Sequence, residues 1–202
     1  MPRGRPREFD AEKALDRALD VFWRKGYEGA TLPDLTEAMG INRPSLYAAF
    51  GNKEQLFRKA LERYVEGPAC YVQESLAQPT ARKVVESLLR GGIEMLTNPK
   101  YPSGCFAVQS ALACGDEASD LRDELSARRK TLELALRRRF QDAVKAGDLP
   151  AKTDAAALAG YISAVIHGMA VQAAGGAKRK DLNRVADLAL RAWSKEVKSP
   201  SK

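Results

Sequence analysis

The chain has 202 residues, of which 45% are apolar and 29% are charged, a composition typical of a globular protein. Its formal net charge of +7 favours a polyanionic partner such as nucleic acid. We find no run approaching the roughly 18 apolar residues of a membrane helix and no apolar signal segment in "MPRGRPREFD", so we expect a cytoplasmic protein with no membrane partner.

Short amphipathic helices are predicted at the start of the chain. Apolar residues recur at spacings of three and four after Asp10, which can cap the first helix, and Gly26 is expected to end it. Thr31 and Asp34 form a capping-box pattern at the start of the second. The third is only about two turns long. The four predicted helices cover residues 10–25, 31–39, 43–50 and 52–65.

The helical pattern continues through the remainder of the chain. No segment alternates with a period of two, so the sequence predicts an all-α protein. The stretch from Asp154 to Ala174 is apolar around most of its circumference and therefore needs burial on more than one side. The later helices are predicted near residues 84–96, 105–114, 121–144, 154–174 and 182–193.

The second and third helices match the helix-turn-helix arrangement, in which the second of the two enters the major groove of DNA. Within "GINRPSLYAAFGNKE", residues 40–54, Arg43 can offer a bidentate fork to guanine. We expect neighbouring base contacts from Asn42, Pro44 and Ser45, and phosphate contacts from Tyr47, Lys53 and Thr31. Taken singly, Pro44, Tyr47 and Lys53 fit a helix start, a packing aromatic residue and a solvated charge equally well.

The N-terminal arm carries "RGRP", residues 3–6, the core string of an AT-hook. In such a segment Gly4 lets the backbone descend into a narrow minor groove, where Arg3 and Arg5 meet enhanced negative potential. A plain solvated tail explains the same four residues.

The segment "ALDVFWRKGYEGATLPDLTEAMGINRPSLYAAFGNKEQLF" resembles the N-terminal domain of the TetR family of transcriptional regulators. "GCFAVQSALACG", "KAGDLP" and "HGMAVQAAGGA" resemble the C-terminal part of one branch. The resemblance implies a homodimer with a four-helix interface and a ligand cavity among the middle helices. It also places the candidate DNA contacts Thr31, Arg43, Pro44, Ser45, Tyr47 and Lys53 on the family's usual contact positions.

We therefore predict a flexible basic arm over residues 1–9, a helix-turn-helix domain over 10–55, and a larger helical ligand-binding and dimerisation domain over 56–198. The apolar stretch 154–174 suits a dimer interface, although an ordinary core helix within one subunit has the same pattern.

An apolar ligand pocket has weaker support in the sequence. Its candidate lining residues have the side chains of such pockets, but each of them is equally at home in an ordinary core. The candidates are Met95, Tyr101, Phe106, Leu112, Tyr161, Ile162, Val165 and Met169.

Three cysteines are too few for a disulfide scaffold. Cys105 and Cys114 bracket a short helix, and a thiol at its N-terminus would have a lowered pKa, which makes them candidate thiol sensors; buried, inert cysteines are the alternative. His167 is the only histidine, so we expect no His-based catalytic triad, no metal site and no cofactor.

The sequence thus predicts a non-enzymatic DNA-binding regulator: a one-component repressor released from a pseudo-palindromic double-stranded DNA operator by a small, apolar inducer. The alternative is an architectural or activating DNA-binding protein without a small-molecule ligand.

Overall fold

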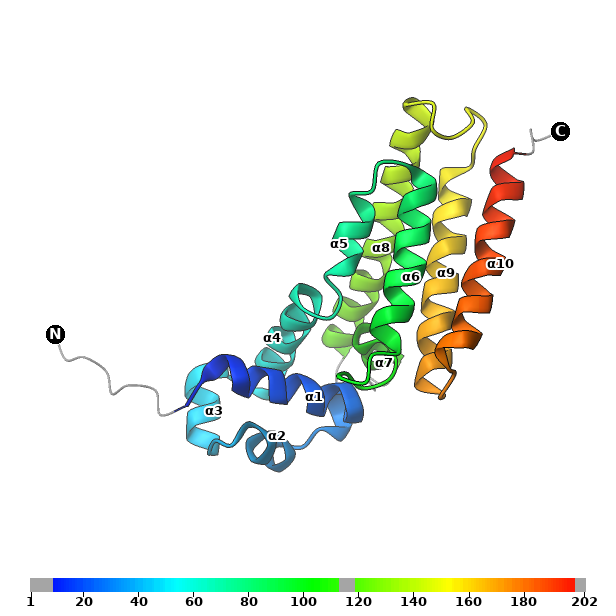
Figure 1. The fold of residues 1–202 in the computed structure, drawn as a ribbon. Helices are drawn as coiled ribbons and strands as arrows, with labels where there is room; N and C mark the ends of the chain where they lie inside the picture. Colours follow the sequence, from blue (N-terminus) through cyan, green and yellow to red (C-terminus); the bar gives the residue numbers. More distant parts are fainter. Residues whose placement is uncertain (1–8, 113–118, 199–202) are drawn as a thin grey trace.

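The computed structural model describes residues 9–112 and 119–198, and all of the regular elements in these ranges are α-helices (Figure 1). This confirms the all-α prediction. The helices are α1 (Ala11–Gly29), α2 (Leu32–Met39), α3 (Arg43–Phe50), α4 (Lys53–Glu66), α5 (Tyr71–Leu76), α6 (Ala81–Leu96), α7 (Phe106–Leu112), α8 (Ser119–Lys145), α9 (Ala155–Ala174) and α10 (Arg179–Lys198).

The first three helices form a small unit at one end of the molecule, with α4 packed against it (Figure 1). Asp10 caps α1, with its carboxylate accepting from the backbone N–H groups of Glu12 and Lys13 at 3.1 and 3.2 Å. The prediction that Gly26 ends this helix was only partly right. Gly26 breaks the helical backbone at φ 71° and ψ 176°, but the chain makes a further turn that extends to Gly29.

The C-terminal part is a bundle in which α6, α8, α9 and α10 lie side by side, with the short helices α5 and α7 packed against them (Figure 1). One apolar stripe of α6 is buried through Leu88 and Leu89, and Phe140 of α8 meets Trp193 of α10 with ring centroids 5.1 Å apart. Helix α5 was not predicted, because its apolar residues Tyr71, Val72 and Leu76 are too few to show a helical period.

The expectation that no segment is apolar enough to span a membrane was wrong for α9. This helix has 20 residues, contains no Asp, Glu, Lys or Arg, and meets the length and hydropathy criteria for a membrane span. Its composition of alanine, glycine and aliphatic residues is apolar without long unbroken runs of large side chains. In the structure α9 is a core helix that packs against α6, α8 and α10.

Helix α4 joins the two parts of the molecule. Phe57 of α4 lies 5.1 Å from Phe22 of α1 and 5.2 Å from Phe106 of α7, measured between ring centroids. Tyr64, two turns further along α4, meets Trp23 edge-on at 4.9 Å. The apolar core is therefore continuous from the helix-turn-helix unit into the C-terminal bundle.

Candidate DNA-binding surface and ligand cavity

The turn between α2 and α3 has the geometry of a helix-turn-helix. Thr31 caps α2 through the predicted capping box, in which Asp34 N donates to Thr31 Oγ1 at 3.2 Å and Thr31 N donates to Asp34 Oδ2 at 3.0 Å. Gly40 then ends α2 in the left-handed region at φ 68°, where a residue with a Cβ is strained. The chain therefore reverses within three residues, and α3 starts at Arg43.

The N-terminus of α3 presents Asn42, Arg43 and Pro44 of the predicted base contacts to solvent, while Ser45 is half-buried. Asn42 caps the helix, since its Oδ1 accepts from Ser45 N at 2.8 Å. Arg43 and Pro44 are exposed, and in the described ranges Arg43 makes no hydrogen bond or ion pair. Tyr47, one turn on, is 48% exposed, while Leu46 and Phe50 on the opposite side are buried. One face of α3 is thus packed in the core, and the opposite face is accessible to a binding partner.

Lys53, the first residue of α4, lies over the ring of Tyr27, with Nζ 4.6 Å from the ring centroid. Partial burial lowers the pKa of Lys53. The Tyr27 ring is itself fixed by an edge-on contact with Phe57 at 5.3 Å. Tyr27 and Phe57 therefore position the Lys53 ammonium at the N-terminus of α4, the positive end of the helix dipole. This is an arrangement that binds anions.

Arg3 and Arg5 of the predicted arm lie outside the described residues. The first described residue, Phe9, packs its ring against Phe50, the last residue of α3, with centroids 6.3 Å apart. The chain therefore enters the fold beside the helix that carries the candidate base contacts.

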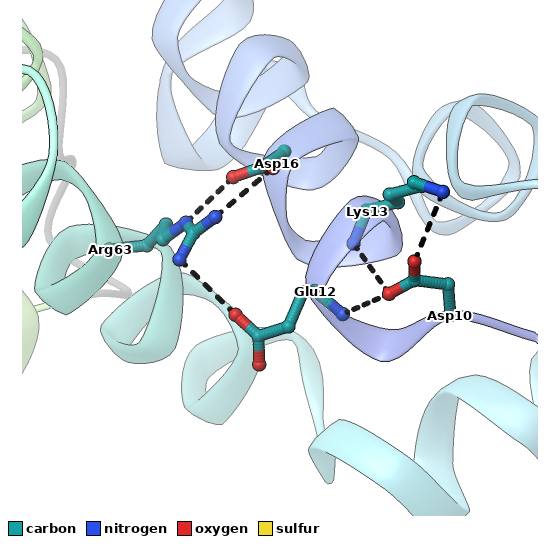
Figure 2. Close-up of polar contacts among 5 residues, drawn as sticks. All are labelled: Asp10, Glu12, Lys13, Asp16 and Arg63. Atoms are coloured by element: carbon teal, nitrogen blue, oxygen red, sulfur yellow. Dashed lines mark hydrogen bonds and ion pairs between the residues drawn. The ribbon is translucent and has the colours of Figure 1, made fainter.

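Figure 2 shows how Arg63 of α4 is tied to Asp16 and Glu12 of α1. The guanidinium of Arg63 donates from Nε to Asp16 Oδ1 at 2.7 Å and from Nη2 to Asp16 Oδ2 at 3.2 Å. It also reaches Glu12 Oε2 at 3.2 Å. On the opposite side of α4, Arg58 donates to Glu124 of α8 at 2.8 Å. Ion pairs thus connect α4 both to the helix-turn-helix unit, α1 to α3, and to the C-terminal bundle.

A cavity of about 260 Å³ opens among α4 to α9. Its lining is mostly aliphatic, and no Asp, Glu, Lys or Arg of the described part of the chain belongs to it. The polar or aromatic members of the lining are Tyr64, Tyr71, Gln73, Cys105, Thr131 and His167.

The residues predicted to form an apolar pocket are mostly elsewhere. Met95 lines the cavity, but Phe106 and Met169 are buried in the core and Tyr101 stacks on Trp23 at 5.8 Å. Ile162 is also buried in the core, and Val165 is partly buried against that core. Tyr161 is exposed on α9, and the side chain of Leu112 lies outside the described part of the chain. The cavity instead uses α4 and α5, because the unpredicted helix α5 forms one of its walls.

Of the two interpretations of the cysteines, Cys105 fits the buried thiol better than the acidic one. Cys105 lines the cavity directly before α7, and burial raises the pKa of its thiol. Desolvation is the largest cause and outweighs the hydrogen bonds from Tyr64 and from the Val108 and Ala107 backbone, which lower the pKa. Cys114 lies outside the described residues. Among the described residues, no three His, Cys, Asp or Glu side chains gather where they could hold a metal ion.

Comparisons with known proteins match both parts of the chain. The family model "Bacterial regulatory proteins, tetR family" matches residues 14–60, and "Tetracyclin repressor-like, C-terminal domain" matches residues 79–189. The HTH-type transcriptional repressor ComR of Escherichia coli (strain K12) is 35% identical over 200 residues, which cover 97% of this chain and 94% of ComR.

Solved structures agree with these matches. A cysteine mutant of the TetR family transcriptional regulator CifR, complexed with 26-bp double-strand operator DNA, is 46% identical, with a TM-score of 0.90 over 94% of this chain and 100% of that one. A TetR transcriptional regulator from Rhodococcus sp. RHA1 is 44% identical, with a TM-score of 0.61 over 89% and 96% of the two chains. With a helix-turn-helix unit joined to a helical bundle and both family models matched, the chain belongs to the TetR family of bacterial regulatory proteins.

Proposed function

We propose that this regulator is a cytoplasmic one-component repressor that binds a pseudo-palindromic operator as a homodimer and leaves it when a small molecule occupies the cavity between α4 and α9. The observation that carries the DNA-binding part is the outward face of α3, where Arg43 is exposed and unpaired within the described ranges at the start of a helix whose other face is buried. The relatives ComR and CifR, by name a repressor and an operator-binding regulator, support the same proposal.

The DNA contacts divide into two classes. Arg43, with Asn42, Pro44 and Ser45 beside it, would read base edges from the N-terminus of α3. Phosphate contacts would come from Thr31, Tyr47 and Lys53. Thr31 caps the start of α2, Lys53 is the first residue of α4, and Tyr47 lies on the exposed face of α3. Arg3 and Arg5 would add minor-groove contacts from an arm that enters the fold beside α3 at Phe9.

The dimer would form through α9 and α10. Helix α9 carries no charged residue, yet it leaves Tyr161 and Val171 exposed, and Leu188 of α10 is 61% exposed. A second subunit that covers Leu188 would explain why this large apolar side chain is exposed in the single chain. A two-fold axis through these helices would place two copies of α3 about 34–36 Å apart, one helical turn of DNA.

The release step would use α4, which carries both a cavity residue and the link to α1. Tyr64 lines the cavity and meets Trp23 of α1 edge-on, and its neighbour Arg63 holds Asp16. A ligand that displaces Tyr64 would therefore move α1, and with it the spacing of the two recognition helices. We place the DNA-binding domain at residues 10–55 and the ligand-binding and dimerisation domain at 56–198.

Fluorescence anisotropy with the purified protein tests this proposal. Labelled pseudo-palindromic DNA from beside its own gene is compared with scrambled DNA at near-physiological salt. We expect a preference of about 10³-fold or more for the specific site. Weak, steeply salt-dependent binding to both would leave only phosphate attraction. Specific binding that no small molecule relieves would favour the alternative, an architectural or activating protein without a ligand.

A further inference from the structure

The cavity has a polar end in an otherwise aliphatic lining. Tyr64 Oη and Cys105 Sγ lie 3.1 Å apart, within hydrogen-bonding distance. Tyr71, on α5, lies close enough to Cys105 for the two groups to interact electrostatically. These three residues bring two phenol hydroxyls and a thiol to one wall of a cavity that no described Asp, Glu, Lys or Arg lines.

Gly91 and Gly92 of α6 set the position of Tyr71. A Cβ on Gly91 would lie 2.6 Å from Tyr71 Cδ2 and 3.1 Å from its Cγ, and a Cβ on Gly92 would lie 3.4 Å from Tyr71 Oη. Glycine inside a helix is destabilising relative to alanine. The close approach of the Tyr71 ring gives this pair a structural reason, because any side chain at Gly91 would push the ring away from α6.

The hydroxyls at this wall are hydrogen-bond donors. Burial raises the pKa of Tyr64 and Tyr71 above their ordinary value, with the neighbouring Cys105 as a smaller cause, so both phenols stay protonated at neutral pH. Tyr64 and Cys105 share one hydrogen bond. No hydrogen bond to another described residue engages the Tyr71 hydroxyl, so its proton is available to a guest in the cavity.

We infer that the cavity takes an uncharged, mainly apolar small molecule with one oxygen acceptor, and that Gly91 and Gly92 hold Tyr71 as the donor that selects it. This inference rests on the proposed control of the protein by a small molecule. Among the described residues no Asp, Glu, Lys or Arg lines the cavity, so a carboxylate or an ammonium would lose its hydration in the aliphatic part without an opposite charge from one of these side chains to replace it. A pure hydrocarbon would cover the Tyr71 hydroxyl without offering it an acceptor.

Three probes of matched size test the ligand class by titration calorimetry on the full chain. Acetophenone is neutral and carries a carbonyl acceptor, α-methylstyrene replaces that oxygen by a methylene group, and benzoate replaces the methyl ketone by a carboxylate. We expect acetophenone to bind more tightly than α-methylstyrene by about 2- to 10-fold, the worth of one net hydrogen bond, and benzoate to bind least. Equal binding of benzoate and acetophenone, or no binding of acetophenone at all, would overturn the inference.

Two variants and one control locate the donor. Tyr71→Phe should abolish the preference for acetophenone over α-methylstyrene without weakening α-methylstyrene. Gly91→Ala should reduce acetophenone binding as well, because the ring must move. Ser87→Ala removes a hydroxyl that bonds to Ser75 at 2.8 Å outside the cavity lining, and it should leave the preference intact. A preference that survives in Tyr71→Phe would show that Tyr71 is not the selecting donor.

Operator anisotropy with the same probes separates this inference from the proposed function. Acetophenone that binds with the expected preference but does not release the operator would leave the ligand class standing and contradict release by a ligand. Release of the operator by benzoate alone would support release by a ligand and contradict the inferred ligand class.

Discussion

Arg63 of α4 holds Asp16 of α1 through two parallel hydrogen bonds of 2.7 and 3.2 Å (Figure 2). The next residue, Tyr64, lines the cavity and packs edge-on against Trp23 of α1. Adjacent positions on one helix therefore contact the cavity and the DNA-binding unit. An event in the proposed ligand cavity that moved Tyr64 would therefore reach α1 directly.

Arg63→Ala should loosen this connection with little loss of fold. The side chains of Arg63 and Asp16 are 36% and 51% exposed, so the free energy of unfolding should fall by no more than about 1 kcal/mol. Urea unfolding at low and high salt measures the effect, which should shrink as salt rises. Arg24→Ala is the matched control, since Arg24 pairs with Asp20 within α1 alone. A loss in Arg63→Ala no larger than the control's would mean that the bridge between helices adds nothing.

Arg43→Ala and Lys53→Ala should weaken operator binding in different ways. If Arg43 reads a guanine, its loss should cost about 1–3 kcal/mol on the specific site and relax the choice of base at one position. Lys53→Ala should weaken binding to all sequences and reduce the salt slope by about 1, as expected for a phosphate contact. Anisotropy on the operator, a single-base variant and scrambled DNA separates the two. An equal loss on every sequence in Arg43→Ala would remove the base-reading role.

The DNA-binding unit was predictable because its signals are local. Thr31 with Asp34, and Asn42 before Pro44, fix helix starts through contacts within three residues, and the structure shows those contacts. Gly40 reverses the chain through its own backbone conformation. Nothing in these features depends on distant parts of the chain, so spacing alone was sufficient.

The cavity was not predictable in the same way, because it is made by packing between helices. Met95 was identified, but Tyr64 and Tyr71 look in the sequence like ordinary apolar positions of α4 and α5. The position of Tyr71 depends on Gly91 and Gly92, some twenty residues later in the sequence, and that relationship appears only in three dimensions. Burial likewise reversed the expected pKa shift of Cys105, since a sequence does not show how much solvent a thiol loses.

Asp34 should make the helix-turn-helix unit sensitive to acid. The Lys25 ammonium and then the Thr31 backbone N–H lower the pKa of Asp34 to about 2 from an ordinary value of 3.8. Between these values the unfolded chain binds a proton that the folded chain does not, so this stabilisation is complete above pH 3.8 and is lost as the pH falls to about 2. Thermal unfolding of wild type and Asp34→Asn should differ at neutral pH and converge on acidification. A constant difference down to pH 2 would contradict this role.

Leu188→Glu should split the proposed dimer without unfolding the subunit, because Leu188 is 61% exposed on α10 and packs little within its own chain. Sedimentation velocity should show a monomer, and operator binding should fall steeply, since one half-site is then held by one subunit alone. Leu134→Glu is the matched control: Leu134 is 50% exposed on α8, outside the proposed interface. A dimer that survives Leu188→Glu and dissociates in Leu134→Glu would move the interface from α10 to α8. Identical sedimentation of both variants and the wild-type dimer would exclude both leucines from it, and the exposed face of α9 around Tyr161 and Val171 would then have to hold the subunits together by itself.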